Sequence, residues 1–236
     1  MAGFRYDAQV LARFPTTRGG VLVVRGLRSG STAPGLLEAF RAEQVKVLTR
    51  LGGQPLATVP SLAAWRRVFR AFGVDPTQTR SAAEALLRRL TKKGDLPSVN
   101  LLVDAGNLVS IRYALPVAVL DLGHIAGGIT VRFAEGDEPF TELDSEEVKY
   151  PEPGEVIFVD DDGVVCARRW CWRQSAQSGA REGTTDVLVT VEAHHDAGEQ
   201  EVKAAIDEIA VLLQEHAGGA ATHALLSPER AEFQEE

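Results

Sequence analysis

The feature that most constrains the fold is a long apolar segment at residues 97–133 that small polar side chains interrupt repeatedly. The interrupting residues are Asn100, Asp104, Asn107, Ser110, Arg112 and Asp121. A buried polar group without a hydrogen-bond partner costs about 1–3 kcal/mol, so a plain core strand or helix would not carry so many. Two interpretations are open: these groups satisfy one another and the nearby backbone, or they line a pocket. Gly127-Gly128 then allows the backbone to turn or to approach another group closely.

Hydrophobic periodicity predicts helices in the first half of the chain and strands in the second. Val21–Val24 is predicted as a buried strand, and helices are predicted from Pro34 to Gly52, from a cap at Ser61 to about Phe72, and from a capping box at Ser81 to Gly94. From residue 97 onward the pattern indicates strands at 129–133, 155–160, 164–170 and 186–192, with a hairpin turn at Asp161-Asp162-Gly163.

The end of the chain is predicted to close the fold with one helix, around 202–213, that ends at Gly218-Gly219. We expect residues 220–236 to form a C-terminal tail after a single domain over 1–219. Helices followed by mainly antiparallel strands and a closing helix indicate the α+β class, with a sheet-centred domain and flanking helices.

The lengths of the apolar runs and the spacing of the cysteines bear on the cellular location of the protein. No run reaches the length of about 18 residues that indicates a membrane span, and the N-terminus lacks the apolar region of a signal peptide. Cys166 and Cys171 do not have metal or redox spacing, so free thiols in a reducing compartment are expected. The sequence therefore predicts a cytoplasmic protein without a membrane partner.

Charge is distributed unevenly along the chain. The net charge of −8 argues against general nucleic-acid binding, and no DNA partner is expected. Residues 61–93 nevertheless hold eight basic residues against two acidic ones, whereas residues 134–162 hold twelve acidic residues against one lysine. Two interpretations are open: a local positive face for a partner, or ordinary solvated helix faces.

The common catalytic motifs are missing: the chain has no GxSxG elbow, no Walker loop and no HExxH. His194 and His195 are adjacent, so on a strand they would point to opposite faces, and we expect neither a metal site nor a cofactor. The most unusual string is Arg168–Gln174. On a strand, Trp170 and Trp172 would share one face and stack on bases; alternatively the tryptophans belong to the core and the arginines extend past them.

Three motifs in a fixed order carry a resemblance. These are Asn100-x-x-Val-Asp-x-x-Asn107, a proline five residues before Asp121, and Gly127-Gly-Ile-x-Val-Arg-x-Ala-x-Gly-x-Glu138. The chain resembles the editing domain of the phenylalanyl-tRNA synthetase beta subunit and, more closely, the free-standing B-three/B-four tRNA-binding proteins. The similarity extends more weakly from about residue 14 to 192.

The resemblance implies a central pocket in an α+β domain and a tRNA partner whose aminoacylated 3′ end enters that pocket. The finer hypothesis is a trans-editing deacylase that hydrolyses mischarged aminoacyl-tRNA; such an ester is labile, so a positioned water and donors for the oxyanion suffice. The catalytic set implied here is Asn107, Ser110, Arg173 and Glu192. The substrate-binding set is Asn100, Asp104, Asp121, Arg169, Trp170, Trp172 and Gln174. Phosphate contacts are assigned to Arg66, Arg70, Arg88 and Arg89.

The chain departs from the family pattern at two places. Ala118 stands where the synthetase family has a histidine, and Trp170–Gln174 stand where that family has a Met-Gly-Gly loop. A pocket altered in this way need not accept the same amino acid. A second hypothesis is therefore a binding module for a free amino acid or similar zwitterion held between Glu192 and Arg173, and a structural pocket without any ligand is a third.

Overall fold

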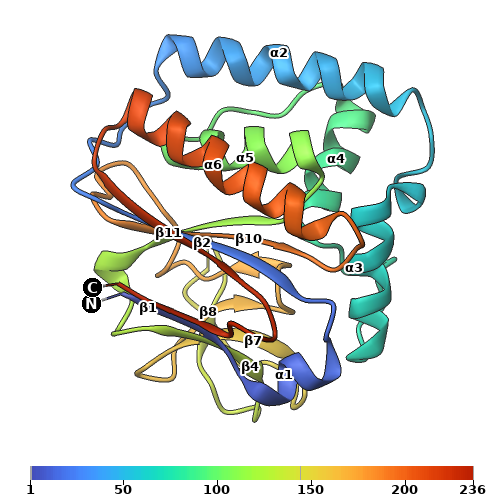
Figure 1. Ribbon diagram of the computed structural model, residues 1–236, viewed down its shortest axis with the longest axis vertical. Helices are drawn as coiled ribbons and strands as arrows, with labels where there is room; N and C mark the ends of the chain where they lie inside the picture. The colour runs from blue at the N-terminus through green and yellow to red at the C-terminus, as the bar shows by residue number, and fades with distance from the viewer. Residues whose placement is uncertain (1, 144, 236) are drawn as a thin grey trace.

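The computed structural model describes residues 2–143 and 145–235, and its centre is a four-stranded antiparallel sheet (Figure 1). The strand order is β11 (Ala220–Leu226), β2 (Arg18–Arg25), β10 (Val187–Ala193) and β3 (Val117–Asp121). In β2 and β10 both faces are covered, so their β-branched runs are buried throughout apart from the ends of β2.

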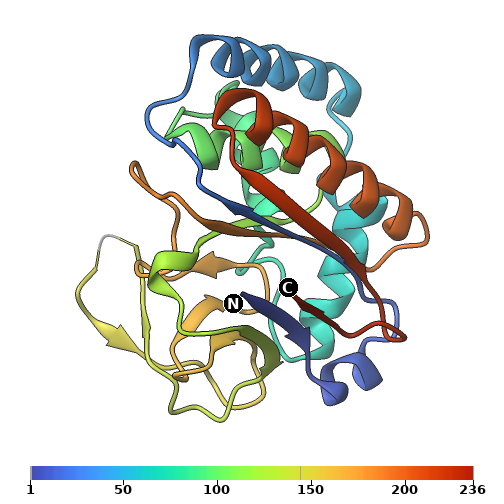
Figure 2. The same cartoon turned by 60° about the vertical axis from the view of Figure 1, so that its left-hand side comes forward.

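A second sheet of six strands packs against one face of the first. Its order is β12 (Glu232–Gln234), β1 (Gly3–Tyr6), β4 (Ile129–Phe133), β7 (Val156–Asp160), β8 (Val165–Arg168) and β9 (Arg173–Gln174). β1 pairs parallel to β4 and antiparallel to β12, which brings the two ends of the chain side by side (Figures 1 and 2). A small hairpin, β5 (Phe140–Thr141) with β6 (Val148–Lys149), lies outside both sheets.

Helices form the third layer. On the other face of the four-stranded sheet, α5 (Leu101–Tyr113) and α6 (Gly198–His216) lie against the strands, and α2 (Pro34–Leu51) and α4 (Ala82–Lys93) pack mainly on α5 (Figure 1). α1 (Ala8–Arg13) and α3 (Pro60–Ala71) contribute side chains to the space between the two sheets, and the short helices η1 (Leu56–Thr58) and η2 (Leu122–His124) complete the connections. Among the described helices, none has the length and apolar character needed to cross a membrane.

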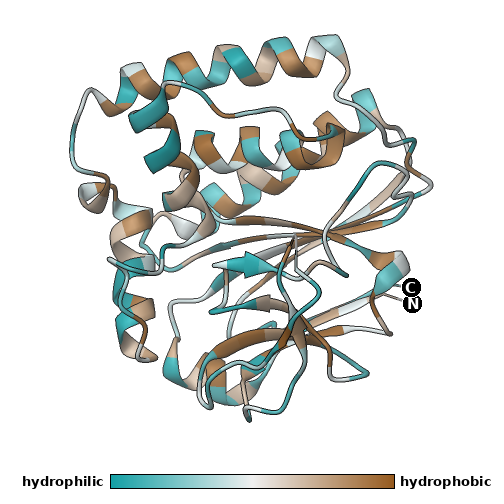
Figure 3. Ribbon diagram, turned by 180° about the vertical axis from the view of Figure 1, so that it is seen from behind, coloured by the Kyte–Doolittle hydropathy of each residue, from teal (hydrophilic) through white to brown (hydrophobic). Residues whose placement is uncertain are grey.

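The two faces of the central sheet belong to two different hydrophobic cores. On β2, Leu22 and Val24 pack under the helices, while Val21 and Val23 face the six-stranded sheet. This alternation follows from the two-residue period of a strand. Seen from behind, the strands are largely brown and the helices carry both brown and teal stripes, as expected for amphipathic helices on a buried sheet (Figure 3).

The α+β class is confirmed, and so are most elements. The helix at 34–51 ends at Gly52, and the helix at 82–93 ends at Gly94; both glycines have positive φ, at 53° and 85°. The hairpin at Asp161-Asp162-Gly163 and the strands at 129–133 and 187–193 are also confirmed.

Apart from the strand at 164–170, which ends at Arg168, three predictions about elements are wrong. The pattern from residue 97 onward indicated strands, but residues 101–113 form helix α5, with the Asn100 side chain accepting a hydrogen bond from the Val103 N–H at its N-terminus. Ser61 does not cap α3, because the helix already begins at Pro60 after Val59.

The predicted tail is the third error. Residues 220–226 form β11, which pairs along the whole of β2, and residues 232–234 form β12 beside β1. Residue 236 lies outside the described residues. The error has a physical cause, since both strands gain their hydrogen bonds from partners about 200 residues away in sequence, which leaves no local pattern.

Candidate functional site

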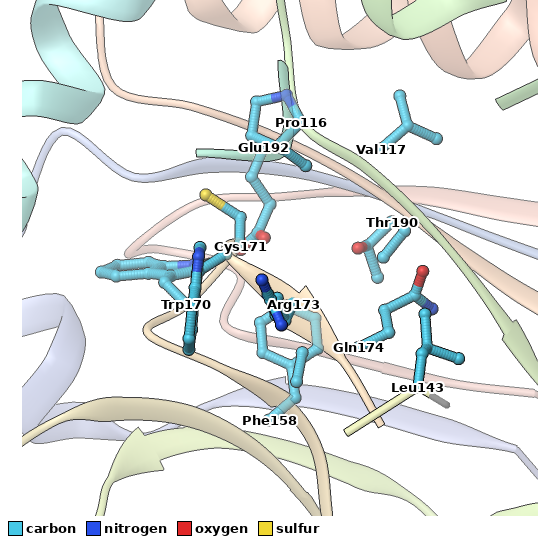
Figure 4. Close-up of a pocket in the computed structure, with 14 residues that line it drawn as sticks. Pro116, Val117, Leu143, Phe158, Trp170, Cys171, Arg173, Gln174, Thr190 and Glu192 are labelled. Carbon is cyan, nitrogen blue, oxygen red and sulfur yellow. Dashed lines mark hydrogen bonds between the residues drawn. The ribbon is translucent and has the colours of Figure 1, made fainter. Parts of the chain in front are cut away.

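A pocket of about 340 Å³ lies between the two sheets, where β3 and β10 face β7, β8 and β9 (Figure 4). Its residues come from both sheets, from the turn after β8 and from the first residue of α4. They are Ala82, Pro116, Val117, Ala118, Leu143, Phe158, Ala167, Trp170, Cys171, Trp172, Arg173, Gln174, Thr190 and Glu192.

The buried acid of the pocket is Glu192, which β10 directs between the sheets with 2% of its surface exposed. The Tyr6 hydroxyl and the Trp170 indole N–H both donate to its Oε1, at 2.7 and 2.8 Å. Trp65 Nε1 donates to the Glu192 main-chain carbonyl at 3.3 Å. No described residue hydrogen-bonds to Oε2. One carboxylate oxygen is thus held by the protein, and the other is available to a group in the pocket.

Burial shapes the electrostatics around Glu192. It raises the pKa of Glu192 to about 7, although the hydrogen bonds from Trp170 and Tyr6 oppose the shift. Desolvation and the nearby Glu192 carboxylate raise the pKa of the Cys171 thiol well above its ordinary value, and the same two causes raise the pKa of Tyr6. At neutral pH the pocket therefore contains a carboxyl group that can exchange a proton and a thiol that stays protonated, which argues against Cys171 as a nucleophile.

Trp170 reaches Glu192 because the chain turns sharply after β8. Arg169 and Trp170 have φ of 46° and 62°, a left-handed conformation that costs non-glycine residues about 1–3 kcal/mol. The turn buries the Trp170 ring completely, against Phe14, Trp65 and His194 with ring centroids 5.3, 5.4 and 4.9 Å away. The predicted strand carrying two tryptophans on one face is therefore wrong, and Trp170 belongs to the core.

Trp172 lies at the edge of the pocket, with the guanidinium carbons of Arg169 and Arg173 at 4.7 and 4.8 Å from its ring centroid. Arg173 donates to Glu142 Oε2 at 2.9 Å, and its side chain is 52% exposed. Gln174 Nε2 donates to the Val119 carbonyl at 2.9 Å and so joins β9 to β3. These residues line the pocket as expected, whereas Arg169 turns away from it.

Arg169 contacts the far side of this turn. Its Nη1 donates to the Thr79 hydroxyl at 2.7 Å, and its backbone N–H donates to Glu155 Oε1 at 3.0 Å. We conclude that Arg169 stabilises the turn that positions Trp170.

Four other predicted site residues have structural hydrogen bonds and do not reach the pocket. Asn100 caps α5, and Asp104 accepts hydrogen bonds from Thr32, Ser98 and the Val99 N–H. The Ser110 hydroxyl donates to the Leu115 carbonyl, and Asp121 accepts from Thr184 and the Gly123 N–H. For these groups the first interpretation of the polar segment holds in part: they are satisfied by backbone groups and by the hydroxyls of Thr32, Ser98 and Thr184, and not by one another.

Asn107 is half-buried on α5 and does not line the pocket either. The convergence expected for Asn107, Asp121, Arg173 and Glu192 is therefore found only for Arg173 and Glu192. The other two lie on the opposite, helical side of β3 or at its far end.

The basic helices adjoin the pocket through α4, whose first residue, Ala82, lines it. Arg70, Arg88 and Arg89 are exposed. Arg66 instead forms an ion pair with the buried Glu84, so its charge is already matched. Three of the four predicted phosphate-binding arginines therefore remain available at the surface.

Several pocket residues escaped the sequence analysis. Thr190 was detectable, because it precedes Glu192 by two positions on a strand and shares its face. Tyr6 gave no signal, since it reaches Glu192 across 186 positions of sequence.

His194 also stands behind the pocket, 4% exposed and packed against Trp65 at 4.5 Å between ring centroids. Burial lowers its pKa to about 3, so it is neutral. Within residues 2–143 and 145–235 no group of three or more histidine, cysteine or acidic side chains is arranged to hold a metal ion.

The sequence is similar to that of several known proteins. The sequence profile of the B3/4 domain matches residues 64–218. The phenylalanine–tRNA ligase beta subunit of Nocardia farcinica is 31% identical over 173 residues, which cover 64% of this chain and 20% of the relative. That of Mycolicibacterium paratuberculosis is 32% identical over 175 residues, covering 73% and 20%. The chain thus spans about a fifth of the length of these curated relatives.

Among solved structures, an N-terminal fragment of the phenylalanyl-tRNA synthetase beta subunit from Pyrococcus horikoshii aligns with a TM-score of 0.49 and 14% identity. The alignment covers 93% of this chain and 50% of the fragment.

Proposed function

The chain belongs to the B3/4 domain family, and from this premise we propose that its pocket receives the aminoacylated 3′ end of a tRNA and hydrolyses the ester of a mischarged amino acid. The observation that carries the proposal is the half-satisfied carboxyl group of Glu192: Oε1 is held by Tyr6 and Trp170, and Oε2 has no partner among the described residues.

Such a site needs few catalytic groups. An aminoacyl ester is labile, so a general base and a correct orientation suffice, without a covalent nucleophile. A general base is most effective when its pKa lies near the working pH, and the pKa of Glu192 is raised to about 7. In this role Glu192 takes the proton of the attacking water through Oε2.

The shape of the pocket supports an aminoacyl group as its occupant. Its volume of about 340 Å³ is at the lower end of the range for small-molecule sites, about 300–1,000 Å³. Ala118, Phe158 and Ala167 offer apolar contact to a side chain. Arg173 pairs with Glu142 at the exposed edge, and in the proposed complex it exchanges this partner for a phosphate of the tRNA end, because a guanidinium binds phosphate with two parallel hydrogen bonds.

The path of the tRNA follows from the neighbouring helix. Arg88 and Arg89 lie six and seven residues after Ala82, so about 9–10 Å along the α4 axis from the pocket edge. In this arrangement they contact phosphates upstream of the 3′ end. A tRNA partner implies a cytoplasmic location.

The direct experiment measures ester half-lives for a panel of twenty correctly charged and several mischarged aminoacyl-tRNAs, with and without the protein. We expect acceleration for at least one mischarged pair and little for its correctly charged counterpart. Unchanged half-lives across the whole panel would contradict the proposal.

A second candidate is a binding module for a free amino acid, favoured by one observation: Glu192 and Arg173, of opposite charge, line the same pocket. Such a ligand would raise the unfolding midpoint, because it binds only the folded state. Thermal unfolding with a panel of free amino acids separates the two functions. A saturable rise without any accelerated ester hydrolysis favours the binding module.

A further inference from the structure

β3 is an edge strand, so the main-chain N–H and C=O groups of every second residue point out of the sheet. In an antiparallel sheet, successive residues direct their N–H and C=O groups to opposite sides. The Val119 carbonyl accepts from Gln174 Nε2 and from the Ala180 N–H, and the Asp121 N–H donates to the Ser178 carbonyl. These groups point away from β10, so by alternation the N–H and C=O of Val117 point away from β10 as well.

The outer side of β3 is covered only in part. Residues 174–180 lie along it from Val119 to Asp121, including a bridge between Leu120 and Gly179. No described residue hydrogen-bonds to the main chain of Val117. The cover therefore ends where the pocket begins.

Val117 is among the residues that line the pocket. Its side chain packs on the helical side, where a Cβ added to Gly106 would lie 3.5 Å from Val117 Cγ1. The adjacent Ala118 packs on the other side, with the core between the sheets. Because the Val117 side chain is turned away, the pocket surface at this residue consists of backbone atoms.

We propose that the main chain of Val117 is the anchoring point for the α-amino ester of the bound substrate. The Val117 N–H donates to the ester carbonyl, and the Val117 C=O accepts from the α-ammonium group. This inference rests on the proposed function and adds a specific recognition of α-amino esters to it.

The spacing of the groups supports this pairing. An amino acid carries its donor and its acceptor on either side of one Cα, and so does one residue of an edge strand, so the two pair as neighbouring strands do. Adjacent strands lie about 4.8 Å apart, so an ester held on the outer side of β3 is about 10 Å from the β10 main chain, and the pocket that Val117, Thr190 and Glu192 all line spans this distance. A backbone N–H fixed at the carbonyl also stabilises the negative charge that develops there during hydrolysis.

The test removes the N–H alone. Val117→Pro deletes a donor that the sheet does not use, at an edge position where proline is tolerated. Val117→Ala is the matched reference, because it shortens the side chain and keeps the N–H. We expect kcat/KM for the most rapidly hydrolysed aminoacyl-tRNA to be about ten- to a hundred-fold lower in V117P than in V117A, as for a lost hydrogen bond to a charged group. Equal values in two folded variants would overturn the inference.

A second measurement uses the unaltered protein and so does not depend on the folding of V117P. The same tRNA is charged with the deamino analogue of its amino acid, and the catalysed rate is divided by the spontaneous rate. We expect this ratio to fall about ten-fold or more, since the α-ammonium contact is lost. An unchanged ratio overturns the inference while leaving the proposed function intact. If the unaltered protein accelerates no aminoacyl-tRNA, the proposed function fails and the inference fails with it.

Discussion

The two faces of β10 are equally buried and chemically different. Val187, Val189 and Val191 pack in the hydrophobic core on the helical side of the sheet. Leu188, Thr190 and Glu192 face the six-stranded sheet, and the last two line the pocket. Every residue of the strand is buried. Burial by itself therefore does not distinguish a core from a site; the distinction lies in what packs opposite.

The difference arises from how each face is covered. α5 and α6 lie directly on the sheet, α2 and α4 pack mainly on α5, and the leucines and isoleucines of these helices fill the space between the layers. On the other face, two sheet edges meet, and Gln174 of β9 joins β3 by a single side-chain hydrogen bond. The space beside this contact is the pocket, so a polar residue there can reach a ligand.

The largest expected effect is on catalysis. Glu192→Gln keeps an amide oxygen for the hydrogen bonds from Tyr6 and Trp170 but cannot accept a proton from water. We expect hydrolysis of the best aminoacyl-tRNA to fall about 10²–10⁴-fold, the range for loss of a general base. Single-turnover hydrolysis measures the effect. Glu199→Gln, at a glutamate whose side chain is 73% exposed on α6, serves as the control. A Glu192→Gln protein with normal turnover removes Glu192 from the mechanism.

The next effect is on the pH dependence of stability. The folded pKa of Glu192 is raised to about 7, above its ordinary value near 4.5, so between these values the folded state binds more protons than the unfolded state. The free energy of unfolding contributed by this group is therefore highest below pH 4.5 and is lost as the pH rises through about 7, by about 3 kcal/mol in all.

The measurement is urea unfolding of the unaltered protein and of Glu192→Gln from pH 5 to 8. His194, whose pKa is lowered to about 3, destabilises both proteins alike as the pH falls below about 6.5, so it cancels in the difference. We expect the stability of Glu192→Gln relative to the unaltered protein to increase with pH. A constant difference would mean that Glu192 is not desolvated in the folded state.

A smaller effect is expected on the free energy of unfolding, when one residue is changed on each face of β10. Val191→Thr places a hydroxyl in the helical core, where it has no partner, and we expect it to cost about 1–3 kcal/mol. Thr190→Val, one position away, removes a hydroxyl from the pocket surface and should cost less than about 1 kcal/mol. Urea unfolding with an unchanged slope checks both values. Equal losses of stability in the two variants would mean that both faces of β10 exclude water to the same extent.

The smallest effect concerns the tRNA contact. Arg88→Ala and Arg89→Ala should each reduce the slope of log Kobs against log salt concentration by about one, because each arginine neutralises about one phosphate. Filter binding between 50 and 200 mM salt measures the slope. Arg41→Ala, at an exposed residue of α2, is the control and should leave it unchanged. Three equal slopes would locate the tRNA elsewhere on the surface.

Much of the fold was predictable because its signals are local. Glycines with positive φ end α2 and α4, and the Ser81 side chain accepts from the Glu84 N–H as a cap should. The misassigned helix α5 has a physical reason: it is enclosed by α2, α6 and β3, so nearly all of its residues are buried and no polar stripe reveals the helical period.

The candidate site was predictable only in part. Glu192, Arg173, Trp172 and Gln174 were expected at one site, and they line the same pocket. The prediction that Trp170 and Trp172 share one face of a strand was wrong because Arg169 and Trp170 both have positive φ, which turns Trp170 into the core. Such a turn without glycine has no signature in sequence.

The sequence by itself determined most of the elements, the ends of α2 and α4, the period of β10 and hence the common face of Thr190 and Glu192. Only the tertiary structure decided which polar groups reach a cavity, because that depends on partners far away in the chain. Asp104 and Glu192 are both buried acids. Asp104 is satisfied by Ser98 and Thr32, whereas Glu192 meets Tyr6 on a different sheet and keeps one oxygen for the pocket. Hydrogen bonds of such long sequence separation are fixed by packing of the layers, and no local pattern encodes them.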